Sequence, residues 1–560
     1  MNILLRCALP LAIGLAVPLS AAPAAAPTAT MPANYGQLAS FFSEWRAFVA
    51  PPVQRGVPDY SAAGVARQAA ALPTWRARLA AIDQAGWSTA AKNDYRIVAA
   101  ELNAFDFNLR VLKPWARDPG FYANIAADWS DVPAHEGQTA EPNIDLYAWK
   151  WPLKPADDKA LTAALAAVPA NLAAARTNLA GSMAHDLWAY GSAAFEDQSA
   201  ALAALGAGTL KLRTLDGPVL ADMKGASPAL RQAIAAAKTA IDEFAAWVAA
   251  EVPKRTGPTG VGKADYNWHA KNVMLSPHDW DAQMTLLQRE LDRSLAGLRL
   301  EEVRNRKLPP LQPLTDPAAY GRMVAERQAK FSAFFTETGL STREPYLATA
   351  IAAQSVDFAP EGSRNFFSHV TMRDPLPLIS HFTHWMDLAR LRAAPHASPI
   401  RRATPAFNMY ADRSEGFATA FEEIAMQAGL YDDLPRGREL VWIMLANRAA
   451  RGIASLRVQA NEIDLATAGQ YHAGWTPRGW SDPSSKLVGF EQLLYARQPG
   501  YGPSYIIGKI QLDHLMAVAS HADDVAGKPF VMRDFFARTM AAGIMPVALI
   551  EDEMFAPGIR

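Results

Sequence analysis

Cysteine is nearly absent from this sequence of 560 residues, and the single one, Cys7, lies close to the N-terminus. Without that residue the chain forms no disulfide and offers no thiolate for a metal or for nucleophilic catalysis. An excess of positive charge is also missing, because 54 Lys and Arg residues face 55 Asp and Glu residues. This balance argues against nucleic acid as a partner. Runs of β-branched residues are scarce and alanine is abundant, which favours helices over strands.

The first 22 residues have the pattern of a signal peptide. Arg6 is followed by an apolar segment, residues 7–19, that is too short to cross a bilayer as a mature helix. A Ser-Ala-Ala sequence at positions 20–22 provides a cleavage site, and residues 23–34 form a linker rich in alanine and proline. We therefore expect a protein secreted to the bacterial periplasm or the cell exterior, without cysteine and with no membrane contact after cleavage. A short membrane anchor is the alternative.

The remaining residues, 35–560, have the pattern of one large helical domain. Residues 161–181 and 227–252 repeat apolar side chains at spacings of three and four, as amphipathic helices do. A helix beginning at Pro435 is apolar on most faces, so we expect it to be buried. No stretch alternates like a series of strands. The sequence therefore predicts an all-α fold with a small sheet or hairpin at most.

A break rich in proline and glycine, residues 253–263, interrupts the helical pattern. It separates an N-terminal half, residues 35–255, from a C-terminal half, residues 256–560. Within the break, residues 257–263 have the spacing of a phosphate-binding loop but lack its final Ser or Thr. The preceding segment is a predicted helix, whereas such a loop follows a strand. We interpret this segment as a connecting loop.

Two histidines in the C-terminal half are candidate metal ligands. Residues 377–395 form a predicted helix between two prolines, and His381 and His384 lie about 60° apart on one face of it. A second helix, expected over residues 405–429, carries Glu415. Neutral imidazole and carboxylate are good ligands for zinc, and helical proteins build such sites between facing helices. The sequence therefore predicts that His381, His384 and Glu415 bind one zinc ion.

Neighbouring charged residues allow a second interpretation. Asp387, Glu422 or Glu423 would orient a ligand from an outer layer if a metal is bound. The same stretch also contains many arginines, including Arg401 and Arg402, so a buried network of ion pairs bracing two helices explains the pattern without any metal. Recognition of an anionic group by this basic pair is a further alternative.

Three segments resemble the bacterial domain-of-unknown-function 885 family. Residues 414–433, SEGFATAFEEIAMQAGLYDD, resemble its E-G-W-A-L-Y-A-E-E…G-L-Y-D-D segment. Residues 495–510, YARQPGYGPSYIIGKI, resemble its P-G-Q-A-x-S-Y-x-x-G segment, and residues 262–266 match its G-x-x-x-Y segment. The resemblance implies a large multi-helix fold similar to helical zinc peptidases of the angiotensin-converting-enzyme type, with a deep central cleft.

The sequence departs from that family at its metal motif, H-E-x-x-P-G-H. Counting back from Glu415 places the first histidine of the motif on His381. The catalytic glutamate then falls on Phe382 and the second histidine on Asp387, while Trp-Met replaces Pro-Gly. A general base and one imidazole are therefore missing. His384 is additional and would replace the lost ligand if the helix runs straight.

The resemblance implies a zinc-dependent hydrolase of peptides or related amides. Asp387, Glu422 or Glu423 would then substitute for the missing base. Tyr505, at the family's S-Y position, would donate a hydrogen bond to a tetrahedral intermediate. Arg497 and Lys509 would bind a substrate carboxylate. The alternative is a noncatalytic descendant of the same scaffold that binds a peptide or a small molecule.

Overall fold

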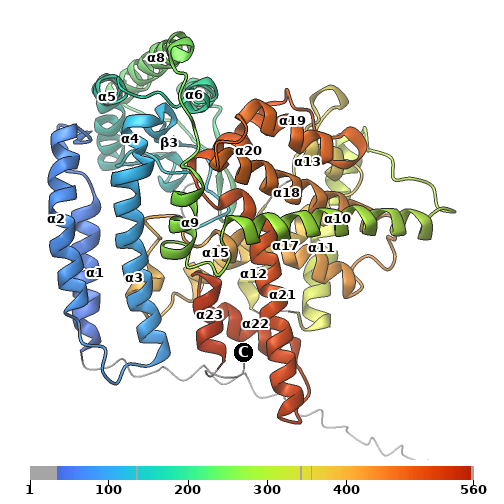
Figure 1. Ribbon diagram of the computed structural model, residues 1–560. Coiled ribbons are helices and arrows are strands. Elements are labelled where there is room, and N and C mark those ends of the chain that lie inside the picture. The colour runs from blue at the N-terminus through green and yellow to red at the C-terminus, as the bar shows by residue number, and fades with distance from the viewer. Residues whose placement is uncertain (1–33, 134–136, 341–343, 355, 556–560) are drawn as a thin grey trace, which may run out of the picture.

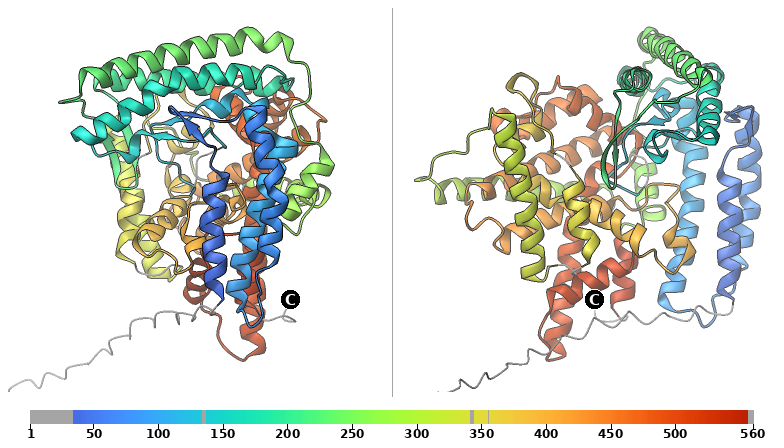
Figure 2. Two further views of the ribbon diagram at one scale, coloured as in Figure 1. Left: turned by 90° about the vertical axis from the view of Figure 1, so that its left-hand side faces the viewer. Right: turned by 180° about the vertical axis from the view of Figure 1, so that it is seen from behind.

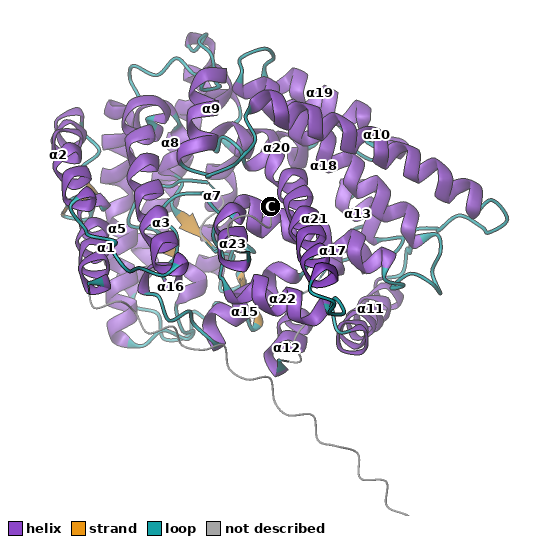
Figure 3. Cartoon of the chain, turned by 60° about the horizontal axis from the view of Figure 1, so that its bottom comes forward, coloured by secondary structure: helices purple, strands orange, loops and turns teal. Residues whose placement is uncertain are grey.

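The computed structural model describes residues 34–133, 137–340, 344–354 and 356–555. The signal peptide predicted for residues 1–22 and nearly all of the predicted linker lie outside these ranges. The described residues form 23 α-helices and three two-stranded sheets, so the predicted all-α class is confirmed (Figure 3). None of the described helices combines the length and apolar character needed to span a membrane.

Three N-terminal helices lie side by side along one edge of the molecule (Figure 1). They are α1 (Tyr35–Val49), α2 (Ala62–Ala80) and α3 (Thr89–Phe107). The starts of α2 and α3 are set by serine caps, because Ser61 and Ser88 each accept a hydrogen bond from a backbone N–H in the first turn. Their apolar faces belong to the same hydrophobic core as the C-terminal helices.

A second, smaller core lies under the helices at the top of the molecule (Figure 2). These helices are α5 (Pro155–Asn178), α7 (Ala193–Ala207) and α8 (Pro228–Glu251). The short strands are β1 (Val53–Gln54), β2 (Val57–Pro58), β3 (Ile125–Ala126), β4 (Ile144–Asp145), β5 (Lys211–Thr214) and β6 (Gly217–Leu220). The pair β3–β4 is parallel and the other two pairs are antiparallel.

Four long helices form the centre of the C-terminal half: α10 (Trp280–Arg304), α17 (Ala411–Gln427), α18 (Gly437–Gln459) and α21 (Tyr501–Val525). Every residue of α18 except Arg438 and Arg457 is buried, which confirms the prediction for this helix. Helices α17 and α21 touch backbone to backbone, because a Cβ at Gly416 would lie 2.3 Å from the Cα of Gly508. Only glycines permit this contact.

The remaining α-helices of the described residues complete the fold. They are α4 (Pro114–Arg117), α6 (His185–Ala189), α9 (Lys263–Asn272), α11 (Pro317–Thr338), α12 (Pro345–Ala353), α13 (Phe366–Thr371), α14 (Leu376–Ser380), α15 (Thr383–Ala393), α16 (Pro399–Arg402), α19 (Leu465–Trp475), α20 (Lys486–Arg497), α22 (Met532–Ala541) and α23 (Val547–Met554). Residues 257–263 join α8 to α9 and follow a helix, as expected for a connecting loop.

Two predicted helix boundaries are wrong. The helix predicted over residues 377–395 is two helices, α14 and α15, separated by a tightened turn at His381 and Phe382. In this turn the backbone N–H groups of both residues bond to carbonyls three residues back, which ends the α-helical ladder. Helix α17 begins at Ala411, not at residue 405, because the preceding segment buries Phe407 and Met409 in the core instead of coiling. Its predicted stop is confirmed, since Gly429 follows the helix with a positive φ of 103°.

Candidate metal centre

The three predicted ligands come from the turn between α14 and α15 and from the first half of α17. His381 caps α14, His384 lies in the first turn of α15, and Glu415 lies in the second turn of α17. All three side chains are buried, and His381 retains the most exposure, 10% of its side chain. The turn that divides the predicted helix therefore still presents both imidazoles toward α17.

The ligand atoms of these residues form a compact triangle. The Nε2 atom of His384 lies 3.1 Å from Nε2 of His381 and 3.1 Å from Oε2 of Glu415. The third side, from His381 Nε2 to Glu415 Oε2, is 3.6 Å. Nitrogen and oxygen ligands at about 2.0–2.1 Å from a tetrahedral zinc ion lie roughly 3.3 Å from one another. The observed spacings fit such an ion with three protein ligands.

A carboxylate and a guanidinium orient His381 through its Nδ1 atom, on the side of the ring away from the triangle. The Nδ1 atom of His381 lies 2.8 Å from Oε1 of Glu422, which is two turns after Glu415 on α17. Arg448 of α18 donates to both oxygens of Glu422 at 2.6 Å. Burial raises the pKa of Glu422, but Arg448 and His381 outweigh burial and hold the pKa below its usual value. An ionised Glu422 accepts the Nδ1 proton of His381, so the Nε2 lone pair faces the candidate site.

Tyr501, which was not among the predicted residues, fixes the third ligand. Its hydroxyl donates to Oε1 of Glu415 at 2.5 Å, while the other carboxylate oxygen, Oε2, faces the two imidazoles. Tyr501 begins α21, one turn before the predicted Tyr505, and the close contact of α17 with α21 brings it to Glu415. The one-turn spacing from Tyr505 is the sequence signal that could have pointed to it.

The electrostatics of the triangle favour a charged pair. Burial raises the pKa of Glu415, but His384 and His381 outweigh burial and bring the pKa well below its usual value. Burial lowers the pKa of His384, and Glu415 more than compensates, so the pKa is raised. The carboxylate and the imidazole thus stabilise each other's charged form, and binding of a divalent ion would take the place of this interaction. A buried ion pair that only braces α15 against α17 would have the same contacts.

Asp387 and Tyr505 make contacts next to the triangle. Both oxygens of Asp387 accept from Arg413, at 2.8 and 3.1 Å, in a buried bidentate pair. The half-buried ring of Tyr505 lies under the guanidinium of Arg451, 4.8 Å from the ring centroid. Among the described residues, the His, Cys, Asp and Glu side chains that converge as possible ligands are His381, His384 and Glu415, so Asp387 is outside this group.

The two predicted substrate-binding cations pair with carboxylates of the protein. Arg497 donates to Asp118 at 2.5 Å and to the carbonyl of Gln138 at 2.8 Å. Lys509, almost fully buried, lies 3.0 Å from Glu423 and 2.9 Å from Asp513. It lines a cavity of about 650 Å³ between α10, α17 and α21. These partners neutralise both cations within the fold.

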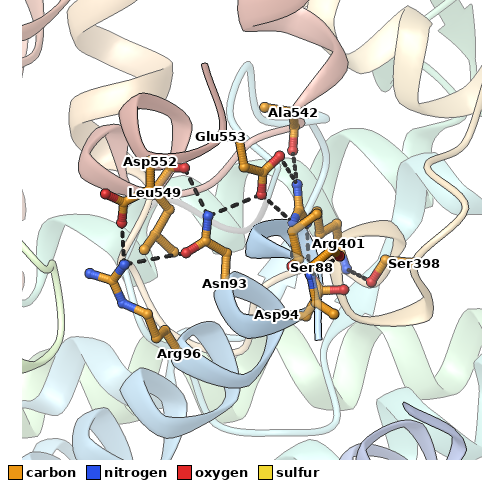
Figure 4. A network of polar contacts seen from close by, with 12 residues as sticks. Ser88, Asn93, Asp94, Arg96, Ser398, Arg401, Ala542, Leu549, Asp552 and Glu553 are labelled. Carbon is orange, nitrogen blue, oxygen red and sulfur yellow. Dashed lines mark hydrogen bonds and ion pairs between the residues drawn. The ribbon is translucent and has the colours of Figure 1, made fainter. Parts of the chain in front are cut away.

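Arg401 braces α16 against two distant helices (Figure 4). Its Nε donates to Asp94 of α3 at 2.6 Å, and its terminal nitrogens donate to Glu553 of α23 at 2.5 and 3.0 Å. Next to this pair, Asn93 and Arg96 of α3 also contact α23. Arg401 therefore has the bracing role that was one alternative for the basic pair, whereas Arg402 is exposed.

Comparisons with known proteins show the fold and the family. Two solved structures are similar along nearly the whole chain. One is a candidate lipoprotein of unknown function from Shewanella oneidensis, with 14% identity, a TM-score of 0.63, and coverage of 93% of this chain and 98% of that one. The other is a candidate lipoprotein from Colwellia psychrerythraea, with 12% identity, a TM-score of 0.59, and coverage of 92% and 98%. No curated protein matches.

A family model matches residues 48–334, just over half of the chain, and its description is bacterial protein of unknown function. The match ends before His381, so the candidate metal centre lies in the part of the chain beyond it. The family resemblance deduced from the sequence is confirmed. This chain belongs to the bacterial DUF885 family of proteins of unknown function.

Proposed function

We propose that this protein is a secreted zinc-dependent hydrolase of peptides or related amides. The observation that carries the proposal is the convergence of His381 Nε2, His384 Nε2 and Glu415 Oε2 at mutual distances of 3.1–3.6 Å. Catalytic zinc sites have three protein ligands and one open coordination position, whereas structural sites use four protein ligands.

The side chains around the triangle prepare it for an ion. His381 and His384 provide neutral nitrogen ligands, and the contact of Glu422 with His381 sets which ring nitrogen carries the proton. The hydrogen bond from Tyr501 occupies one oxygen of Glu415 and leaves the other as ligand. When bound, zinc would supply a Lewis acid that polarises an amide carbonyl and acidifies water. Tyr505, beside Arg451, would donate a hydrogen bond to the carbonyl oxygen as it becomes tetrahedral.

The base that hydrolysis needs does not come from the family's usual position, because Phe382 has no titratable group. Asp387 is bound at both oxygens by Arg413, and Glu422 is bound by Arg448 and His381. Each carboxylate already stabilises a buried cation, so each would lose that ion pair on accepting a proton. Glu423 is likewise bound by Arg293 and Lys509, so each of the three candidate bases would have to give up a cation before it accepts a proton.

A noncatalytic binding protein is the second candidate. Phe382 in place of a catalytic glutamate favours it, and so does the deep burial of His384 and Glu415, with 3% of each side chain exposed. In this case zinc or a peptide would bind and no bond would be cleaved.

Metal content and turnover separate these possibilities. We expect about one equivalent of zinc in the purified mature protein, measured by elemental analysis, and a loss of zinc in His384→Ala and Glu415→Gln. His514→Ala is the matched control, because His514 is exposed and lies away from the triangle. Less than about a tenth of an equivalent after zinc loading would contradict the metal site, since tight sites fill. Zinc binding without cleavage of any member of a peptide library would favour the noncatalytic candidate.

Secretion is supported by the signal-like sequence of residues 1–22 and by the solved neighbours, whose titles describe candidate lipoproteins. We expect cleavage after Ala22, so that the mature protein lacks residues 1–22. The intact mass of protein purified from the periplasm or the medium tests this, and a lipid on Cys7 would contradict it.

A further inference from the structure

A small cavity lies where α15 meets Arg413 of α17 and the end of α22. Its volume is about 50 Å³, and Asp387, Arg390 and Arg413 contribute to its lining. Ala394 and Ala541 also line it and are exposed, so the cavity borders the surface of the molecule. A space of about 10–15 Å³ holds one water molecule, so this cavity has room for roughly three or four non-hydrogen atoms.

Arg413 turns an unused N–H group toward this cavity. Its side chain is buried, with 1% exposed, and Asp387 binds its two terminal nitrogens at 2.8 and 3.1 Å. One of these nitrogens, Nη2, also lies 3.0 Å from the sulfur of Met540, which lines the cavity. In a planar guanidinium the Nε–H bond is parallel to the N–H bond of Nη2 that points away from Nη1, so Nε faces the same side as Met540.

The Nε atom of Arg413 is buried and has no hydrogen-bond partner among the described residues. A buried donor in this state costs free energy, and native proteins keep few of them. An acceptor in the cavity would remove this cost.

The charged groups that line the cavity carry one excess positive charge. Asp387 neutralises Arg413. Arg390, one turn after Asp387 on α15, is half-buried, and its side chain has no ion pair within the part of the chain that the structure describes. His396 adds no charge at pH 7, because burial and then Arg401 lower its pKa from the usual value. The cavity therefore favours a ligand with a single negative charge.

We propose that this cavity binds a small carboxylate, such as formate or acetate, between Arg413 and Arg390. The planar carboxylate matches the edge of a guanidinium, whose parallel N–H groups bind two oxygens in a fixed geometry. Formate and acetate are within the size that the cavity accepts, whereas pivalate, with its tert-butyl group, exceeds it. The proposal is independent of the hydrolase function, because none of the three metal ligands takes part in it.

Thermal unfolding of the mature protein in increasing sodium formate tests the proposal. Sodium pivalate keeps the ionic strength and the carboxylate concentration constant, and a chelator prevents formate from acting through a bound metal. A ligand that binds only the folded state raises Tm as its concentration rises, so formate and acetate should both raise Tm. Arg390→Gln should need a formate concentration at least about tenfold higher for the same rise, because a hydrogen bond to a charged group is lost.

Arg392→Gln is the matched control and should respond to formate as the wild type does. It removes the same kind of side chain from the same helix, but Arg392 is exposed and pairs with Asp216 on the surface. A crystal grown in formate gives a second readout, since a planar ion should lie within about 3.2 Å of Nε of Arg413.

Four results would overturn the proposal. The first is a Tm that does not respond to formate, and the second is an equal response of the wild type and Arg390→Gln. The third is an equal effect of chloride, because a spherical ion would show that the carboxylate shape is not recognised. If Arg390→Gln does not fold, the crystal decides: an ion at Nε of Arg413 supports the proposal, and water alone at this position is the fourth result against it.

Discussion

Replacing Tyr501 with phenylalanine should weaken the metal centre without touching a ligand. The substitution removes one hydroxyl, the donor to Oε1 of Glu415 at 2.5 Å. The ring itself keeps its packing, which includes a stacked contact with Tyr495 at 6.1 Å between centroids. Glu415 is then left buried with an oxygen that has lost its donor, and its carboxylate is free to rotate away from the imidazoles.

The size of the effect follows from the charge and burial of this hydrogen bond. A hydrogen bond to a charged group contributes about 1.5–3 kcal/mol, and the full amount is lost when the acceptor remains buried. Outer-layer partners of metal ligands change metal affinity by about 10–100-fold, which is the same range in free energy. We therefore expect Tyr501→Phe to bind zinc roughly 10–100 times more weakly than the wild type.

Competition with a chromogenic chelator measures this affinity. Tyr505→Phe, one turn further along α21, is the control and should bind zinc with an affinity within about threefold of wild type, because the hydroxyl that donates to Oε1 of Glu415 belongs to Tyr501. Unchanged zinc affinity in Tyr501→Phe alone would refute the reasoning, because it would mean that Glu415 does not depend on this donor.

Three further predictions concern the surrounding fold. Asp387→Asn breaks the buried pair with Arg413 and should cost about 3–5 kcal/mol in the free energy of unfolding while zinc content stays the same; loss of zinc with intact stability would instead make Asp387 a ligand. Gly416→Ala forces a Cβ to 2.3 Å from the backbone of α21, so urea unfolding should show that the free energy of unfolding falls by about 1–3 kcal/mol or more. The control is Gly321→Ala, whose Cβ meets nothing within 4 Å, and it should be neutral or slightly stabilising. Burial raises the pKa of Asp412 from 3.8 to about 7, so the folded state binds this proton more tightly than the unfolded state does. The proton therefore stabilises the folded state at low pH, and this contribution to the free energy of unfolding is lost as pH rises from about 4 to 7. Over that range Asp412→Asn should gain stability relative to the wild type, by up to roughly 4 kcal/mol, and a constant difference between the two proteins would contradict this.

Local signals were sufficient for much of the fold. The abundance of alanine and the three- and four-residue spacings predicted an all-α chain, and the apolar character of α18 predicted its burial, because both depend on residues that are close in sequence. Gly429 was recognised as a helix stop because a positive φ is easy for glycine alone. Proline was a weaker guide. Pro405 marked a helix start in the sequence, but tertiary burial of Phe407 and Met409 keeps that segment out of the helix.

The candidate site could likewise be predicted from the sequence only in part. The sequence by itself determined the types of ligand and the grouping of His381, His384 and Glu415, because short spacing on neighbouring helices limits where these side chains can lie. Only the tertiary structure decided which carboxylates are paired with arginines, since that depends on residues far away in sequence: Arg413 binds Asp387 and Arg448 binds Glu422. It also brought Tyr501 to the ligand Glu415. Contacts of this kind form when distant segments exclude water between them, and no local pattern of residues records which segments those are.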